Sequence, residues 1–520
     1  MAPFIRWLIV NIGLGAACVL TAVAQESSPA KGETPPKSEA DVATAPVKEA
    51  RVVTHHKVTV DGATIDYDAV AGTLTLRDDQ GKPEASMFYV AYVVDRGAGD
   101  SRRPITFFYN GGPGSPSIWL HLGSFGPVRV VTDAPEATPG APFKLEANSG
   151  TLLGKTDMVF LDEIGTGYSR SLGDAKDEKF WGVDSDIDSF AQAITRYLTL
   201  NNRWNSPKFL FGESYGTTRS AGLVFALQKQ GVQFNGVTLL SSILNFGVAD
   251  SGFDRAYVSY LPSYAAAAWY HGKINPKPDD LGKFLGEVRA YAGGPYLLAL
   301  DQGQNLSAAD EDAVARQLSV YTGLSAEFLK ENRLRVTPDR FRKELLRDQH
   351  RTIGRYDSRF LGIDADDGGE GPEFDPAAVY TSGPIVAGYH DYISTQLNYH
   401  GELNYRLKAI DLFKKWDWHH RPPGSSEPEQ QADVALDLAA ALRANPHLQL
   451  LSLNGWYDMA TPFFQTEYDI SHMYLDPSLR DHVHFAYYPS GHMVYLDPAA
   501  LKQMKADVEH FYDEAAPPTP

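Results

Sequence analysis

Short apolar runs that each stop at a polar residue or a glycine most constrain what this chain can fold into. Runs of this length are typical of buried strands in a parallel sheet. They are 105–109 before Asn110, 158–161 before Asp162, 209–211 before Gly212 and 448–453 before Asn454. Helix-like segments, such as 186–200, lie between some of them. Because the carboxyl ends of parallel strands share one edge of a sheet, we expect an α/β fold with its functional residues at that edge.

The segment 212–216 (Gly-Glu-Ser-Tyr-Gly) has the composition of a nucleophile elbow. It follows an apolar strand and precedes a predicted helix at 220–230, which is the context that this motif requires. The turn from strand to helix is sharp, so small residues must flank Ser214 and its hydroxyl is held out at the sheet edge. An ordinary glycine-rich turn is the alternative interpretation, because the bare motif also occurs by chance.

A glycine-rich loop, 110–114 (Asn-Gly-Gly-Pro-Gly), follows the first apolar run. Closely spaced glycines let main-chain N–H groups approach a ligand and face a developing oxyanion. This is where the second oxyanion donor of an α/β-hydrolase is expected. A simple strand–helix turn is the alternative. The Lys-Ser/Thr pair of a phosphate-binding loop is absent, which counts against that third interpretation.

A nucleophilic serine needs a general base, and the base needs a group that orients it. In the α/β-hydrolase fold these residues follow the serine in the order Asp or Glu, then His. Asp458 lies just past the strand at 448–453, and His492 lies just past another predicted strand at 484–488. The sequence therefore predicts a catalytic triad of Ser214, Asp458 and His492, with room for an inserted cap between the first two.

Four separated motifs resemble those of the serine carboxypeptidase family, a branch of the α/β-hydrolases. They are 110–114 (Asn-Gly-Gly-Pro-Gly), 161–169 (beginning Leu-Asp and ending Gly-Thr-Gly-Tyr-Ser), 212–215 (Gly-Glu-Ser-Tyr) and 491–494 (Gly-His-Met-Val, then Asp-Pro at 497–498). Four motifs in the right order are far more specific than any one of them. The chain is thus similar to a secreted, bacterial-type member of this family.

The resemblance implies a role for each residue that matches the catalytic machinery. Ser214 would be the nucleophile, His492 the base and Asp458 its orienting carboxylate. The N–H groups of Gly112 and Tyr215 would form the oxyanion hole. No metal ion or organic cofactor is implied.

The resemblance also implies that Asn110 and Glu213 bind the C-terminal carboxylate of a peptide. A carboxyl group can hydrogen-bond a carboxylate when one of the two is protonated, which implies activity in acid. The chain departs from the family at three places. Position 124 is a serine (Ser124), where the family often has a second glutamate. The residues that continue the glycine loop (114–117) and the serine motif (216–219) also differ from those usual in the family. The carboxylate clamp is therefore incomplete.

The N-terminus predicts export. Arg6, an apolar stretch over 7–20 and the small residues at 22–24 are typical of a secretory signal peptide. A membrane anchor is the alternative, but the apolar run is short for a span. We expect a protein that is secreted or periplasmic and has no stable membrane association once the signal is removed.

The remaining segments predict the domain organisation. Turn signals at 61–62 and 79–81 indicate hairpins, and Ser307 and Thr337 resemble helix N-caps. The expected parts are a signal peptide at 1–24, a disordered linker at 25–50, the first part of the α/β-hydrolase core at 51–250, a mainly helical cap insertion at 251–430, and the second part of the core at 431–520.

Charge and cysteine content narrow the classes of function. The formal net charge of -18 excludes a basic nucleic-acid footprint. Cys18 is the single cysteine and lies in the predicted signal, so thiolate metal sites and disulfides are excluded from the mature chain. The acidic segment 364–369 resembles a calcium loop, but glycine and aspartate stand at its fifth and twelfth positions, so we favour a surface loop.

The sequence is best explained by a secreted serine peptidase of carboxypeptidase type that acts on peptides through an acyl-enzyme. An esterase or acyltransferase with the same triad is the nearest alternative, because a fold and a triad do not fix the acyl donor. The absence of a second glutamate at position 124, which is a serine, keeps that alternative open. A non-catalytic binding protein on a hydrolase scaffold is a further alternative. The sequence does not define an oligomeric state.

Overall fold

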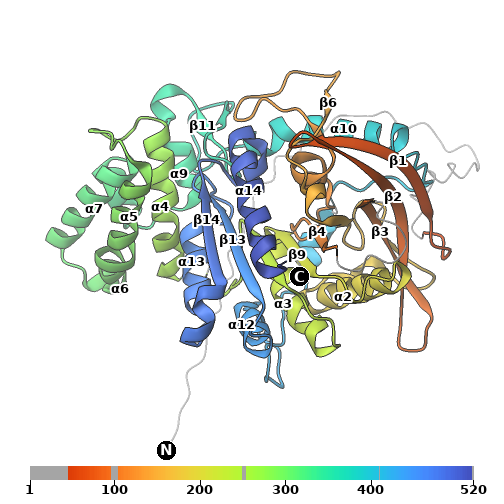
Figure 1. Ribbon diagram of the computed structural model, residues 1–520. Helices are drawn as coiled ribbons and strands as arrows, with labels where there is room; N and C mark the ends of the chain where they lie inside the picture. Colours follow the sequence, from red (N-terminus) through yellow and green to blue (C-terminus); the bar gives the residue numbers. More distant parts are fainter. Residues whose placement is uncertain (1–44, 95–102, 249–252, 409, 518–520) are drawn as a thin grey trace, which may run out of the picture. The chain divides into compact units, whose positions relative to one another are not determined.

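A sheet of ten strands lies at the centre of the computed structural model, which describes residues 45–94, 103–248, 253–408 and 410–517 (Figure 1). In sheet order the strands are β1 (Arg51–Val60), β2 (Ala63–Arg77), β3 (Pro83–Val94), β7 (Asp157–Leu161), β4 (Ile105–Tyr109), β9 (Lys208–Glu213), β10 (Gly236–Leu240), β13 (Gln449–Gly455) and β14 (Val483–Tyr488), with β8 (Arg170–Ser171) beside β3. From β7 to β14 every neighbouring pair is parallel. All four predicted apolar runs are strands of this parallel part.

An antiparallel meander forms the other edge of the sheet. Its strands β1, β2 and β3 pair in sequence order, and β3 then runs antiparallel to β7. Asp61 and Gly62 make the first turn with positive φ angles of 50° and 83°, as the hairpin prediction required. Gly81, with φ of 82°, lies in the second predicted turn.

Helices cover both faces of the sheet. The side chains along each strand point alternately to the two faces, and on each face they form an apolar cluster with the helices. On one face lie α2 (Val183–Leu200), α3 (Tyr215–Lys229) and α12 (Ala435–Ala444); on the other lie α1 (Ile118–Leu120), α10 (Pro376–Thr395) and α14 (Pro498–Ala515). In β4, Phe107 faces the first cluster and Phe108 the second. This is the period-two pattern of a strand that is buried on both sides.

Most of the chain between β10 and β13 is helical. It contains α4 (Asp254–Tyr270), α5 (Leu281–Tyr291), α6 (Leu297–Asp301), α7 (Ala308–Thr322), α8 (Ala326–Glu331), α9 (Pro338–Glu344), α10, α11 (Ile410–Lys415) and the short strands β11 (Thr352–Ile353) and β12 (Leu361–Gly362). Helices α4 to α7 gather beside α13 (Phe463–Ser471), at the β14 side of the sheet (Figure 1). Ser307 and Thr337 cap α7 and α9 through their side chains, as predicted.

The predicted signal peptide, 1–24, lies outside the described residues, as does the linker up to residue 44. The last linker residues pack against the sheet: Glu49 accepts the Thr75 N–H (2.9 Å) and pairs with Arg196, and Ala50 donates to the Thr73 hydroxyl (2.8 Å). Glu49 and Ala50, which the sequence assigned to a disordered linker, thus make defined contacts with the sheet. None of the helices in the described ranges has the length and apolarity needed to cross a membrane.

Candidate active site

Ser214 lies in a tight turn between β9 and α3. Its φ of 59° and ψ of -130° are unusual for a residue with a side chain and cost conformational energy. A Cβ atom at Gly212 would lie 2.1 Å from the carbonyl oxygen of Gly216, so the strand and the helix can meet only where glycine stands. The Ser214 N–H donates to the Leu240 carbonyl at the end of β10 (3.0 Å). The strand–serine–helix context predicted from the sequence is present.

The glycine loop that follows β4 lies directly against the first turn of α3. A Cβ atom at Gly111 would lie 2.3 Å from the main-chain nitrogen of Tyr215, so any side chain there would prevent the contact. Gly112 has a φ of 115°, in the region that favours glycine. The main-chain segments of Gly112 and Tyr215, the two expected oxyanion donors, are therefore close neighbours.

His492 and Asp458 form a buried pair. The Nδ1 atom of His492 lies 2.7 Å from Oδ2 of Asp458. Burial lowers the pKa of His492, but Asp458 and, to a smaller extent, Glu213 act against it and leave the pKa raised. The Asp458 side chain is fixed in turn by the Ala460 N–H (2.7 Å) and by the N–H and hydroxyl of Thr461 (3.0 and 2.8 Å). A carboxylate held in this way orients the imidazole.

Hydrogen bonds through Ser241 connect the serine turn to the histidine loop. Ser241 follows Leu240, whose carbonyl accepts from Ser214, and its own hydroxyl donates to the His492 carbonyl (2.7 Å). Within the described residues, Ser214 and His492 share no direct hydrogen bond. Contacts of this kind in free enzymes are often long and tighten when substrate binds.

Glu213, immediately before the candidate nucleophile, is buried with defined partners. Its Oε2 atom accepts hydrogen bonds from the Asn110 amide (2.9 Å) and the Tyr495 hydroxyl (2.8 Å). Burial raises the pKa of Glu213 to about 7, although His492 and these two donors lower it. The Asn110 side chain also accepts the Leu120 N–H (3.0 Å). The structure thus brings Asn110 and Glu213 together, and their binding of a substrate carboxylate stays a prediction.

A segment from the long insertion holds both loops of the His–Asp pair. The Tyr356 carbonyl accepts the His492 N–H (2.6 Å), and the Arg355 carbonyl accepts the Met459 N–H (3.0 Å). Arg359 donates to the Pro489 carbonyl (2.9 Å) just before His492. These residues are not predictable from the sequence, because they lie far from both loops along the chain and form no motif.

Arg219, five residues after Ser214, is fully buried and was noted in the sequence only as part of a departure from the family pattern. Its guanidinium donates to Asp186 (2.7 Å), to Glu163 (2.7 Å) and to the Asn110 carbonyl (2.8 Å). Glu163 also accepts the Gly114 N–H (3.2 Å). The glycine loop is therefore held at both of its ends. A signal was present in the sequence: a charged residue on the buried face of an apolar helix needs charged partners.

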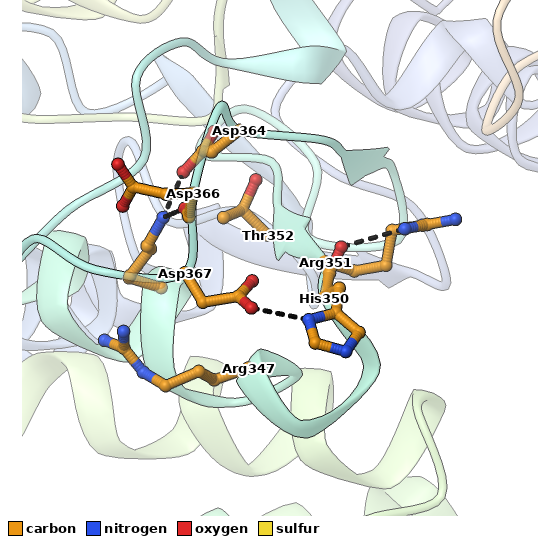
Figure 2. Close-up of a pocket in the computed structure, with 8 residues that line it drawn as sticks. Arg347, His350, Arg351, Thr352, Asp364, Asp366 and Asp367 are labelled. Atoms are coloured by element: carbon orange, nitrogen blue, oxygen red, sulfur yellow. Dashed lines mark hydrogen bonds and ion pairs between the residues drawn. The ribbon is translucent and has the colours of Figure 1, made fainter.

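The calcium-like segment 364–369 is a salt-bridged loop. The Lys343 ammonium donates to Asp364 (2.6 Å) and to the Asp366 carbonyl (2.8 Å), so a side-chain cation lies where a metal ion would be needed. Figure 2 shows this loop, with Asp367 turned toward His350. Asp375, the twelfth position, instead caps α10. In the described ranges, no group of three or more His, Cys, Asp or Glu side chains could hold a metal ion.

Comparisons with known proteins agree with this geometry. The family model for serine carboxypeptidases matches residues 63–285, which include the glycine loop and the serine turn. This part of the chain is therefore similar to serine carboxypeptidases. Among curated relatives, the pheromone-processing carboxypeptidase KEX1 of Saccharomyces cerevisiae is 29% identical over 137 residues, which cover 25% of this chain and 17% of that protein. The chain thus spans less than a fifth of the length of that relative.

Further serine carboxypeptidase relatives match similar lengths. KEX1 of Yarrowia lipolytica is 30% identical over 165 residues (31% of this chain, 24% of that protein), and serine carboxypeptidase-like 20 of Arabidopsis thaliana is 25% identical over 195 residues (36% and 37%). The crystal structure of KEX1 from Saccharomyces cerevisiae aligns with 86% of this chain and 92% of its own, with a TM-score of 0.50 and 15% identity. The predicted α/β-hydrolase fold is confirmed.

Proposed function

We propose that this protein is a serine-type carboxypeptidase that removes C-terminal residues from peptides through an acyl-enzyme. The observation that carries the proposal is the buried His492–Asp458 hydrogen bond of 2.7 Å, on a loop joined through Ser241 to the strained serine turn. The match of residues 63–285 to serine carboxypeptidases supports the substrate class.

In this mechanism the Ser214 hydroxyl attacks the carbonyl of the last peptide bond while His492 accepts its proton. Asp458 stabilises the imidazolium that results. The N–H groups of Gly112 and Tyr215 stabilise the oxyanion of the tetrahedral intermediate. Collapse of the intermediate breaks the C–N bond, and His492 returns the proton to the leaving amine. Water then hydrolyses the acyl-enzyme by the same steps.

Substrate recognition is assigned to Asn110 and Glu213. Glu213 lies next to the nucleophile in sequence, and burial raises its pKa to about 7. A protonated carboxyl group at this position can donate a hydrogen bond to the C-terminal carboxylate of a peptide, whereas an ionised one repels it. Free-acid peptides should therefore be preferred below about pH 7.

An esterase or acyltransferase is the second candidate. It is favoured by Ser124, whose hydroxyl donates to the Leu120 carbonyl within its own helical turn instead of joining Glu213. A site with one acidic group in place of two recognises a free carboxylate less strongly. The chemistry of the triad would be the same.

Peptides with free and amidated C-termini distinguish these functions. Each peptide is incubated with the enzyme between pH 4 and 8, and the products are identified by mass. A carboxypeptidase releases single C-terminal residues from the free-acid peptide, and its preference for that peptide over the amidated one should decline toward neutral pH as Glu213 ionises. Cleavage of p-nitrophenyl esters with no cleavage of either peptide would favour the esterase.

The export, linker and insertion assignments belong to this proposal as well. We place the signal peptide at 1–24, the linker after it, and the mainly helical insertion at 251–430. The mature protein would then act on peptides outside the cytoplasm. N-terminal sequencing of the exported protein tests the first of these, with cleavage expected after Ala24.

A further inference from the structure

The hydroxyl of Tyr495 contacts the carboxyl group of Glu213. Tyr495 lies three residues after His492, in the short helix η8 (Val494–Leu496), and is fully buried. Its hydroxyl donates to Oε2 of Glu213 over 2.8 Å, and the Asn110 amide donates to the same oxygen over 2.9 Å. Two donors thus occupy Oε2. Within the described residues, no hydrogen bond to Oε1 is formed, so Oε1 is the oxygen left to carry the proton of the acid form.

The surrounding backbone makes room for the Tyr495 ring. A Cβ atom at Gly123 would lie 2.6 Å from Cε2 of Tyr495, so the ring fits because position 123 has no side chain. Ser124, the next residue, directs its hydroxyl to the Leu120 carbonyl. The place beside Glu213 is therefore filled by a phenol from the C-terminal part of the chain.

We propose that Tyr495 is a positioning residue for substrate recognition, which acts through its hydrogen bond to Glu213 and so governs how the site binds the free C-terminal carboxylate of a peptide. This inference rests on the proposed carboxypeptidase function. A phenol differs from a second carboxyl group in one decisive respect, because it does not ionise in the range where Glu213 titrates. Burial and the neighbouring Glu213 raise the pKa of Tyr495 further.

The sign of the pH effect follows from which form of Glu213 the donors stabilise. Burial raises the pKa of Glu213; His492, Tyr495 and Asn110 lower it, and Asp458 raises it. A hydrogen bond from Tyr495 is stronger to a carboxylate than to a carboxylic acid. Removal of the phenol oxygen should therefore raise the pKa of Glu213 and keep it protonated to higher pH.

Tyr495→Phe tests this with kcat/KM measured against pH on a free-acid peptide and its amidated counterpart. On the free-acid peptide, the alkaline decline should move to higher pH, and the maximal kcat/KM should fall up to about tenfold because Glu213 loses one of its two fixed donors. The amidated peptide should show neither change. Tyr296→Phe is the matched control, since that buried hydroxyl donates to the Leu334 carbonyl (2.6 Å) in the α4–α7 group, and both profiles should be unchanged.

The outcomes separate the two proposals. If the wild type has identical profiles on both peptides, the carboxylate site itself is wrong and the inference fails with it. Suppose instead that the wild type distinguishes the peptides. If Tyr495→Phe then leaves the pH profile on the free-acid peptide unchanged, or lowers kcat/KM equally on both peptides, Tyr495 has no role in recognition. Site-specific 3-fluorotyrosine at position 495 is a second variant that keeps the packing, and its slightly more acidic hydroxyl should move the alkaline decline to lower pH.

Discussion

Arg219 donates a hydrogen bond of 2.8 Å to the main-chain carbonyl of Asn110 and thereby ties the helix after the candidate nucleophile to the glycine loop. The same guanidinium pairs with Glu163 and Asp186, and all three side chains are buried. Burial raises the pKa of both carboxyl groups, that of Glu163 to about 8. Burial of the two carboxyl groups therefore depends on the positive charge of Arg219 between them.

Arg219→Met should destabilise the fold strongly. Removal of one partner from a buried ion pair leaves an uncompensated buried charge and typically costs about 3–5 kcal/mol. Urea unfolding measures this loss. Arg196→Met is the matched control, because the Arg196–Glu49 pair is partly exposed, and pairs of that kind contribute about 0–1 kcal/mol. Equal losses for the two variants would contradict the importance assigned to the buried network.

His492→Ala and Asp458→Asn should each reduce kcat by several orders of magnitude without a large change in melting temperature. Members of a triad act as a unit, so Ser214→Ala combined with His492→Ala should be little worse than Ser214→Ala alone. Single and double variants are compared by kcat on one peptide. If the losses multiply instead, one of the two residues works outside the triad.

His420 should make stability depend on pH. It lies between Asp184 (2.6 Å) and Asp437 (2.7 Å). Burial lowers the pKa of His420, but the two carboxylates outweigh it and raise the pKa from 6.5 to about 9. Because the folded-state pKa lies above the unfolded value, this stabilisation is complete below pH 6.5 and is lost as pH rises through about 9.

The variant His420→Gln tests this by melting temperature as a function of pH. The difference between wild type and variant should be largest near pH 6 and should shrink toward pH 9. A difference that is constant across this range would mean that packing, and not the charge of His420, stabilises the protein.

Local patterns made the parallel strands and the serine turn predictable. The run 105–109 and the residues that flank Ser214 fit few structures other than a buried strand and a sharp turn. Buried strands must be apolar, and a sharp turn between strand and helix needs glycines. By contrast, β10 is not predictable from a local pattern, because Ser241 and Ser242 after it belong to no recognisable motif. The contacts of Tyr356 with His492 and of Tyr495 with Glu213 depend on how distant segments pack, which no local pattern encodes.

The central claim is that Ser214 is the nucleophile of a carboxypeptidase. A biotinylated fluorophosphonate, followed by peptide mapping of the adduct, tests it most directly, with release of C-terminal residues measured in parallel. We predict a single adduct on Ser214, loss of peptidase activity in proportion to labelling, and neither labelling nor activity in Ser214→Ala, whose kcat should fall on the order of 10⁶-fold. An adduct at another residue, or a folded Ser214→Ala variant that still shortens peptides at the wild-type rate, would contradict the account.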